Sequence, residues 1–143
     1  MSKYINLIKL SVGSESIDTM RDWQAGHMKM FKRDYAMHVT RMWPRREEEL
    51  LNGGSIYWII KGFIQARQRI IGLEEVIGED GIRRCGLKFD PEVIPTTQAP
   101  RRPFQGWRYL NPDDAPADLP KGRENEATIP SDLQNELDAL GLR

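Results

Sequence analysis

Aromatic rings and guanidinium groups lie side by side at three places in the chain. These places are HVTRMWPRR (38–46), GGSIYWIIKGFIQARQRIIGLEEV (53–76) and PFQGWRYL (103–110). A ring can stack on a nucleobase, and a guanidinium can bind the phosphate beside it. The pattern therefore favours a surface for a flat, anionic ligand such as a nucleotide. We expect side chains from the three segments to line one common hollow.

The first cluster lies where a strand leads into a short helix that starts near Pro44. It consists of Arg41, Trp43, Arg45 and Arg46. Free backbone N–H groups at a helix start attract anions, so three guanidinium groups around a tryptophan can clamp a phosphate and stack a base. In the alternative interpretation, Trp43 covers the core and the arginines pair with the three glutamates of residues 47–49.

The second cluster lies on a strand rich in β-branched residues. It comprises Lys61, Arg67 and Arg69, with Tyr57 on the preceding strand. Alternation places Gln65, Arg67 and Arg69 on one face and Ala66, Gln68 and Ile70 on the other. A face with two arginines is costly to bury, so it must contact solvent, a ligand or a partner.

The third cluster follows a run of prolines and is dense in rings. It contains Phe104, Gln105, Trp107 and Arg108, with Gly106 between them. A loop of this composition is typical of a binding segment, and the Gln105 amide offers both a donor and an acceptor to a base edge. The alternative is that its aromatic side chains fill the mouth of a small barrel.

Other chemistries have weak support in the sequence. His27, His38 and Cys85 lack the spacing of a metal site, so we predict neither a metal nor a cofactor. Cys85 alternates onto the apolar side of its strand, which predicts a packed core thiol. His38 lies between apolar neighbours and is either structural, part of a pocket wall or a proton-transfer group.

Length and charge divide the chain into a body and a tail. It has 143 residues with zero net charge, but residues 113–143 hold eight acids and three bases, so the tail carries −5 and residues 1–112 carry +5. We predict a domain over 1–112 and an acidic, largely disordered tail over 113–143, with a short amphipathic helix near 131–140. A single cysteine and the absence of a long apolar run predict a cytoplasmic protein with no membrane contact.

Hydrophobic periodicity predicts the order of the elements. Strands are expected near 5–12, 35–42, 55–61, 65–77 and 82–90, with an edge strand near 92–97. A helix is expected over about 16–33, where the apolar residues Ile17, Met20, Trp23, Met28 and Phe31 fall on near-helical spacing, and a second helix is expected to end at Asn52-Gly53-Gly54. The fold class is therefore α+β: a small, bent mixed sheet or pseudobarrel of five or six strands, with two helices in the N-terminal half.

Several of these motifs match a known family. WPRR, ELLNGGSIYWIIKGFIQARQRI, LEEVIGEDGIRRCGL and PFQGWRYL resemble the alphaproteobacterial domain-of-unknown-function family 1489, a family that carries no established activity. More distantly, Trp43 with Arg46, Gly54 and the strand IIGLEEV (70–76) are similar to motifs of the EVE, ASCH and PUA-type pseudobarrels. That resemblance implies a pocket on the sheet for a nucleobase, often a modified one, or for structured RNA. Glu75 and the basic KGFIQARQR segment depart from the pattern of those pseudobarrels.

Three functional hypotheses follow from these observations. The first is a module that binds RNA or a modified nucleotide, with ligand-binding residues Arg41, Trp43, Arg45, Arg46, Tyr57, Lys61, Arg67, Arg69, Phe104, Gln105, Trp107 and Arg108. The second is a small enzyme that acts on a nucleotide-like anion, with His38 or a carboxylate of residues 47–49 as the acid–base group. The third is a protein-interaction module that uses the acidic C-terminal tail.

Overall fold

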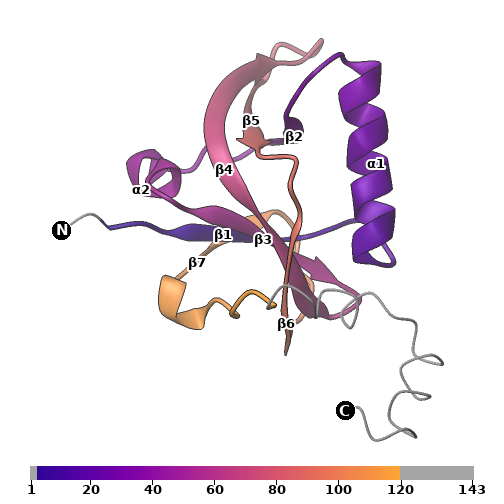
Figure 1. Ribbon diagram of the computed structural model, residues 1–143. Coiled ribbons are helices and arrows are strands. Elements are labelled where there is room, and N and C mark those ends of the chain that lie inside the picture. Colours follow the sequence, from indigo (N-terminus) through magenta and orange to yellow (C-terminus); the bar gives the residue numbers. More distant parts are fainter. Residues whose placement is uncertain (1–2, 120–143) are drawn as a thin grey trace, which may run out of the picture.

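The structure is a computed structural model that describes residues 3–119. Within this range the chain forms one mixed sheet of seven strands with two helices (Figure 1). The strands are β1 (Asn6–Leu10), β2 (Ala36–Thr40), β3 (Ser55–Ile60), β4 (Phe63–Ile77), β5 (Arg83–Phe89), β6 (Ile94–Pro100) and β7 (Trp107–Leu110). The helices are α1 (Ile17–Met30) and the short α2 (Glu47–Leu51), and a 3-10 turn covers Pro112–Asp114. The predicted α+β class and both predicted helices are confirmed.

The strand order is β2-β5-β4-β3-β1-β7, and β6 also pairs with β4. β1 and β3 are parallel, and the other named pairs are antiparallel. β4 is 15 residues long; its first half pairs with β3 and β6, and its second half pairs with β5. The edge strands β2 and β7 do not pair with each other, so the sheet is open and the pseudobarrel alternative is not confirmed.

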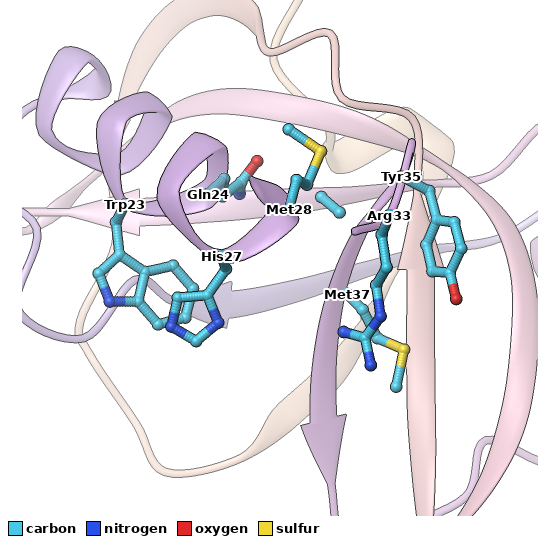
Figure 2. A pocket seen from close by; sticks show the side chains of 8 residues that line it. Trp23, Gln24, His27, Met28, Arg33, Tyr35 and Met37 are labelled. Atoms are coloured by element: carbon cyan, nitrogen blue, oxygen red, sulfur yellow. The ribbon is translucent and has the colours of Figure 1, made fainter. Parts of the chain in front are cut away.

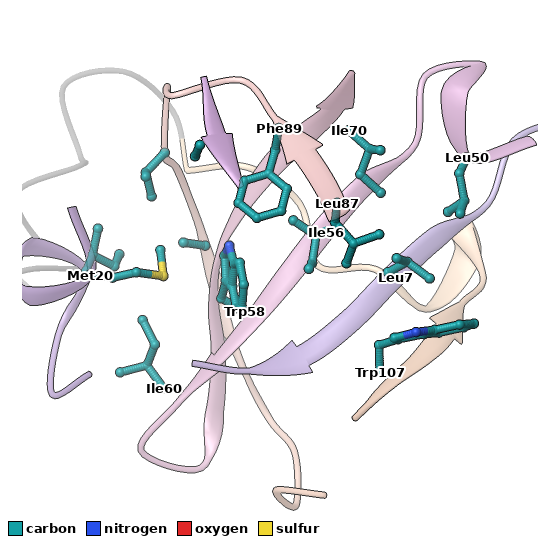
Figure 3. Packing of buried hydrophobic residues seen from close by; sticks show 14 of the residues in the cluster. Leu7, Met20, Leu50, Ile56, Trp58, Ile60, Ile70, Leu87, Phe89 and Trp107 are labelled. Atoms are coloured by element: carbon teal, nitrogen blue, oxygen red, sulfur yellow. The ribbon is translucent and has the colours of Figure 1, made fainter. Parts of the chain in front are cut away.

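β4 bends the sheet around one main hydrophobic core. Its pairing with β5 shifts register between Ile70 and Gly72, and such a bulge increases local bending and twist. The curved β4 ribbon carries the β2–β5 half over the inner face of the β1–β3–β7 half (Figure 1). Trp58, Leu87 and Phe89 fill the space between the two halves (Figure 3). A second, smaller cluster that includes Ile8 and Leu110 lies on the outer face.

Helix α1 packs on the inner side through only part of its apolar pattern. Ser16 begins the helix, because its Oγ accepts a hydrogen bond from Thr19 N at 3.1 Å. The buried residues are Ile17, Met20 and Gln24. Trp23 is 54% exposed and Phe31 is 52% exposed, so these two apolar residues of the helical pattern lie outside the buried face. A polar residue takes the buried position because the Gln24 amide forms two hydrogen bonds with the amide of Gln68 on β4.

The third ring-rich segment is partly a strand. Residues 107–110 form β7, which pairs antiparallel with β1. Gly106 precedes the strand with a φ of +73°, a conformation that a side chain disfavours. Alternation in β7 then buries Trp107 and Leu110, so this half of the segment contributes to the core.

The chain continues after β7 as a strap along β6, comprising residues 112–119. Thr97 N donates to Ala117 O at 2.8 Å, and Leu119 N donates to Pro95 O at 3.0 Å. The helix predicted near 131–140 lies outside the described residues. In residues 3–119, no helix combines the length and the apolar character that a membrane crossing requires.

Candidate functional site

A cleft lined mainly by polar groups lies on the outer face of the sheet, between β1, the starts of β3 and β4, and the strap. Its volume is about 300 Å³. The lining residues are Tyr4, Asn6, Gly53, Ser55, Tyr57, Arg67, Pro112, Ala115, Pro116, Ala117 and Asp118. Two of the predicted ligand-binding residues, Tyr57 and Arg67, therefore meet here. We call this hollow the outer cleft.

Arg67 provides the positive charge of the outer cleft. Its Nε and Nη2 donate to the two carboxylate oxygens of Asp118, both at 2.7 Å, and its Nη1 donates to Ser55 Oγ at 2.9 Å. A guanidinium has five N–H donors, and these three bonds use three of them. The Asp118 carboxylate raises the pKa of Arg67, so this side chain stays charged. The fork thus binds a carboxylate bidentately and keeps two N–H groups for another acceptor.

Two buried side chains add donors to the same cleft. Tyr57 is 7% exposed and Asn6 is 2% exposed. Asn6 Oδ1 accepts a hydrogen bond from Ser55 N at 2.9 Å. Asn6 Nδ2 and the Tyr57 hydroxyl form no hydrogen bond within residues 3–119, and neither atom is fully enclosed, so both can contact a ligand in the cleft. Burial raises the pKa of Tyr57, so its hydroxyl keeps its proton and can donate. A guanidinium, a phenol and an amide around one space are a donor set suited to an anion.

Strand pairing explains why these side chains meet. Tyr57 on β3 lies directly opposite Arg67 on β4, and Ser55 lies opposite Arg69. Cross-strand partners share a face, which places Arg67 beside both Tyr57 and Ser55. The predicted alternation of β4 is confirmed, because Ala66, Gln68 and Ile70 are fully or almost fully buried on the inner side while Arg67 lies on the outer side.

A different set of predicted residues lies on the inner face, around the start of α2. Trp107 is 6% exposed, and its Nε1 donates to Met42 O at 3.0 Å. Trp43 is half-buried against the core, with the Arg83 guanidinium 4.4 Å from its ring centroid. Arg46 forms a bidentate ion pair with Glu49, with N···O distances of 2.6 and 2.8 Å. The arrangement matches the alternative in which Trp43 covers the core and an arginine pairs with a glutamate.

Tyr109, one of the rings of the third ring-rich segment, has a role at the start of α2 that the sequence did not predict. Its hydroxyl accepts hydrogen bonds from the backbone N–H groups of Arg45 and Arg46, at 2.9 and 3.1 Å. These are the N–H groups that were expected to attract an anion, and here they bind the chain's own phenol. The signal was present in the sequence, because Trp107 and Tyr109 share a face in any strand that includes both.

The remaining predicted residues are spread over the surface. Arg41, Arg45, Lys61, Arg69 and Gln105 are exposed in separate loops or on the outer strand face. Arg108 lies over Phe104, with its guanidinium carbon 4.1 Å from the ring centroid. The expected single hollow is therefore not formed, because Trp43 and Trp107 lie inside the bend of the sheet and Tyr57 and Arg67 lie on its outer face.

The two histidines and the cysteine occupy unlike environments. His38 on β2 is half-buried with its ring edge toward Trp58, at a centroid distance of 6.3 Å, and burial lowers its pKa to about 4. The predicted core position of Cys85 is confirmed: the residue is 0% exposed and burial raises its pKa to about 11. Among residues 3–119, no three His, Cys, Asp or Glu side chains gather as metal ligands would.

An exposed row of rings on α1 was not predicted. Trp23 stacks on His27 with ring centroids 3.9 Å apart, and Arg33 lies 4.8 Å from the ring of Phe31. Figure 2 shows Trp23 and His27 side by side below the helix, with Arg33 and Tyr35 across a small hollow. Sequence periodicity placed Trp23 and Phe31 on the apolar pattern of the helix but gave no signal for the buried position of Gln24.

Comparison with known proteins identifies the family. The geometry defines the protein as an α+β domain with a polar cleft, centred on Arg67, on the outer face of its sheet. The chain belongs to the family described as "Protein of unknown function (DUF1489)", whose model matches residues 7–143. The family predicted from the sequence motifs is thereby confirmed. No curated protein and no solved structure gives a significant match to the chain.

Proposed function

We propose that this protein binds a nucleotide, free or within RNA, through a phosphate group in the outer cleft. The observation that supports this proposal is the convergence of unpaired donors around Arg67. The guanidinium keeps two free N–H groups, and the Tyr57 hydroxyl and Asn6 Nδ2 lack partners within the described residues. A phosphate oxygen accepts hydrogen bonds and never donates them when ionised, so it satisfies all three kinds of donor.

The rim of the cleft offers a stacking surface for the base. Tyr4 lines the cleft and is 43% exposed, which leaves ring surface free for a ligand. Trp107, which was expected to stack, is almost completely buried. Stacking on one aromatic ring accepts any base, so this arrangement favours recognition of the phosphate over recognition of sequence.

Asp118 already occupies part of the fork that a phosphate would use. The strap brings this carboxylate to Arg67, and it is 41% exposed, so water and ligands reach it. An incoming phosphate would share or replace its bonds to the guanidinium. Asp118 therefore acts as an internal competitor, and its removal is expected to strengthen binding. A purely structural ion pair predicts no such gain.

Calorimetric titration of the full chain at low salt tests the proposal with three ligands: inorganic phosphate, adenosine monophosphate and a single-stranded RNA hexamer. We expect Arg67→Gln to weaken binding by about tenfold or more, since a hydrogen bond to a charged group contributes about 1.5–3 kcal/mol. Arg69→Gln is the matched control, because Arg69 lies on the same strand and outside the cleft lining. Asp118→Asn is expected to tighten binding by roughly threefold or more.

The three ligands distinguish the sources of the phosphate. Tighter binding of the hexamer than of the mononucleotide, with affinity that falls steeply with salt, would assign the cleft to RNA. Equal binding would assign it to the free nucleotide. If neither the native chain nor Asp118→Asn binds any of the three at millimolar concentration, the proposal is wrong. We also propose a cytoplasmic location, which the reduced, buried Cys85 supports.

A further inference from the structure

Lys9 lies on the inner face of β1, on the opposite side of the strand from the outer cleft. Asn6 and Ile8 point outward, whereas Leu7 belongs to the inner core, so alternation points Lys9 inward. Its cross-strand partners are Trp58 on β3 and Trp107 on β7, and both belong to the inner core. The stem of Lys9 is thus flanked by an indole on each side.

This lysine is buried without a counter-ion. Only 9% of its surface is exposed. Within residues 3–119, its Nζ forms no hydrogen bond and has no carboxylate within 4.0 Å, whereas other inward-facing polar groups such as Gln68 are fully paired. A buried ammonium without a partner is unfavourable, and the chain relieves this cost when the amine loses its proton.

His38 belongs to the other half of the sheet, and its ring edge lies toward Trp58, which is the cross-strand partner of Lys9. The Lys9 charge and burial both lower the pKa of His38, with burial the larger cause, and burial also lowers the pKa of Lys9. A neutral imidazole adds no second positive charge to this part of the interior and supplies a proton acceptor. Among residues 3–119, every fully enclosed polar side-chain atom has a hydrogen-bond partner. Because Lys9 Nζ has none, this atom must keep some contact with solvent.

We propose that Lys9 is a nucleophilic amine that forms a Schiff base with a small aldehyde or ketone, and that His38, which packs against the same Trp58, carries a proton. In this step the neutral amine adds to the carbonyl carbon and its proton passes to the carbonyl oxygen. Loss of one water molecule then leaves a carbon–nitrogen double bond. The observation that supports this proposal is the position of the Lys9 amine, which is buried and unpaired between the indoles of Trp58 and Trp107, in the part of the core that the His38 imidazole also contacts. The proposal is independent of the outer cleft.

Reductive labelling of the native full chain tests this assignment. Glycolaldehyde forms the Schiff base, cyanoborohydride reduces the C=N bond, and peptide mass spectrometry measures the label on each lysine. The exposed Lys61, on the turn between β3 and β4, is the internal control. At pH 7 we expect Lys9 to be labelled roughly threefold faster than Lys61 or more, because a larger fraction of it is neutral.

Two further measurements separate chemistry from structure. In urea the two lysines should be labelled at similar rates, because the surroundings of Lys9 are then lost. His38→Gln should slow labelling of Lys9 by roughly tenfold at pH 7 and leave Lys61 unchanged, as expected for loss of a proton carrier. Labelling of native Lys9 at or below the rate of Lys61 would overturn the proposal.

Discussion

At the residue scale, the Gln68 side chain shows how the interior accepts polar atoms. Its Oε1 accepts hydrogen bonds from Trp58 Nε1 and Gln24 Nε2, both at 2.8 Å, and its Nε2 donates to Gln24 Oε1 and to Asp90 O. Every polar atom of this amide is thus paired. Burial of an amide whose hydrogen bonds are all formed costs little free energy, and these bonds fix the relative positions of α1, β3 and β4.

His38 gives the stability a defined pH dependence. Its pKa is about 4 in the folded chain and 6.5 in an unfolded one, so the unfolded state binds the proton more readily. The contribution of His38 is complete above pH 6.5 and is lost as the pH falls toward 4. The whole effect is about 3 kcal/mol, by the relation between pKa and free energy.

Urea denaturation between pH 7 and pH 4 measures this effect. We expect the free energy of unfolding of the native chain to fall over this interval more steeply than that of His38→Gln, which cannot take up the proton. Carboxylates in ion pairs contribute to both chains alike, so the difference between the two curves isolates the histidine. Parallel curves would contradict the assignment.

Sequence reasoning at this scale succeeded where alternation decides the outcome. It placed Cys85 inside, and it placed Arg67 and Gln68 on opposite faces of one strand, because a period of two fixes such faces. It left two interpretations open for Trp43, and it expected the Trp107 ring to stack on a ligand although that ring is only 6% exposed. The Tyr4 ring and the Asn6 amide at the outer cleft were also missed, because pairing between distant strands brings them there.

At the element scale, the junction between α2 and β3 depends on Gly54. A Cβ at this position would collide with the carbonyl oxygens of Ile5 and Leu50. Gly54 N also donates to Leu50 O at 2.9 Å, and Gly54 O accepts from Ile70 N at 3.0 Å. The backbone here has contacts on several sides, so it cannot move to admit a side chain.

Gly54→Ala is therefore expected to destabilise the chain by about 3 kcal/mol or more, as backbone displacement in a packed region does. Gly26→Ala is the control: Gly26 lies within α1 with no atom close to an added Cβ. That substitution should stabilise by about 0.5–1 kcal/mol, from helix propensity. Thermal unfolding of both variants provides the comparison, and similar melting temperatures would refute the expectation.

The elements were predicted well where hydrophobic period and turn residues agreed. The strands β3, β4 and β5 and the break at Lys61-Gly62 are of this kind, with both turn residues at positive φ. β7 was missed as a strand because Arg101, Pro103 and Gly106 are typical of a loop. Its pairing with β1, about a hundred residues away, overrides the local signal.

At the scale of the whole molecule, the strap joins residues after β7 to the domain. Ala115 packs against the outer cluster, Asp118 pairs with Arg67, and the backbone forms hydrogen bonds with β6. The predicted domain boundary at residue 112 falls at the start of this segment. Because these contacts all involve residues after 111, removing those residues tests the predicted boundary directly.

Two truncated chains provide the test. A chain that ends at residue 111 loses the strap, and we expect its free energy of unfolding to be about 2–3 kcal/mol below that of a chain that ends at residue 119. The longer chain keeps all contacts described above and serves as the control. Equal stability of the two would show that the strap contributes nothing to the fold.

The continuous β4 strand has a consequence for how the protein can be divided. Its first seven residues hydrogen-bond to β3 and its last eight to β5, so one backbone belongs to both halves of the bent sheet. Neither half has a complete set of neighbours without it. Neither half of the sheet is therefore expected to fold without the other, and we expect residues 3–119 to unfold as one cooperative unit.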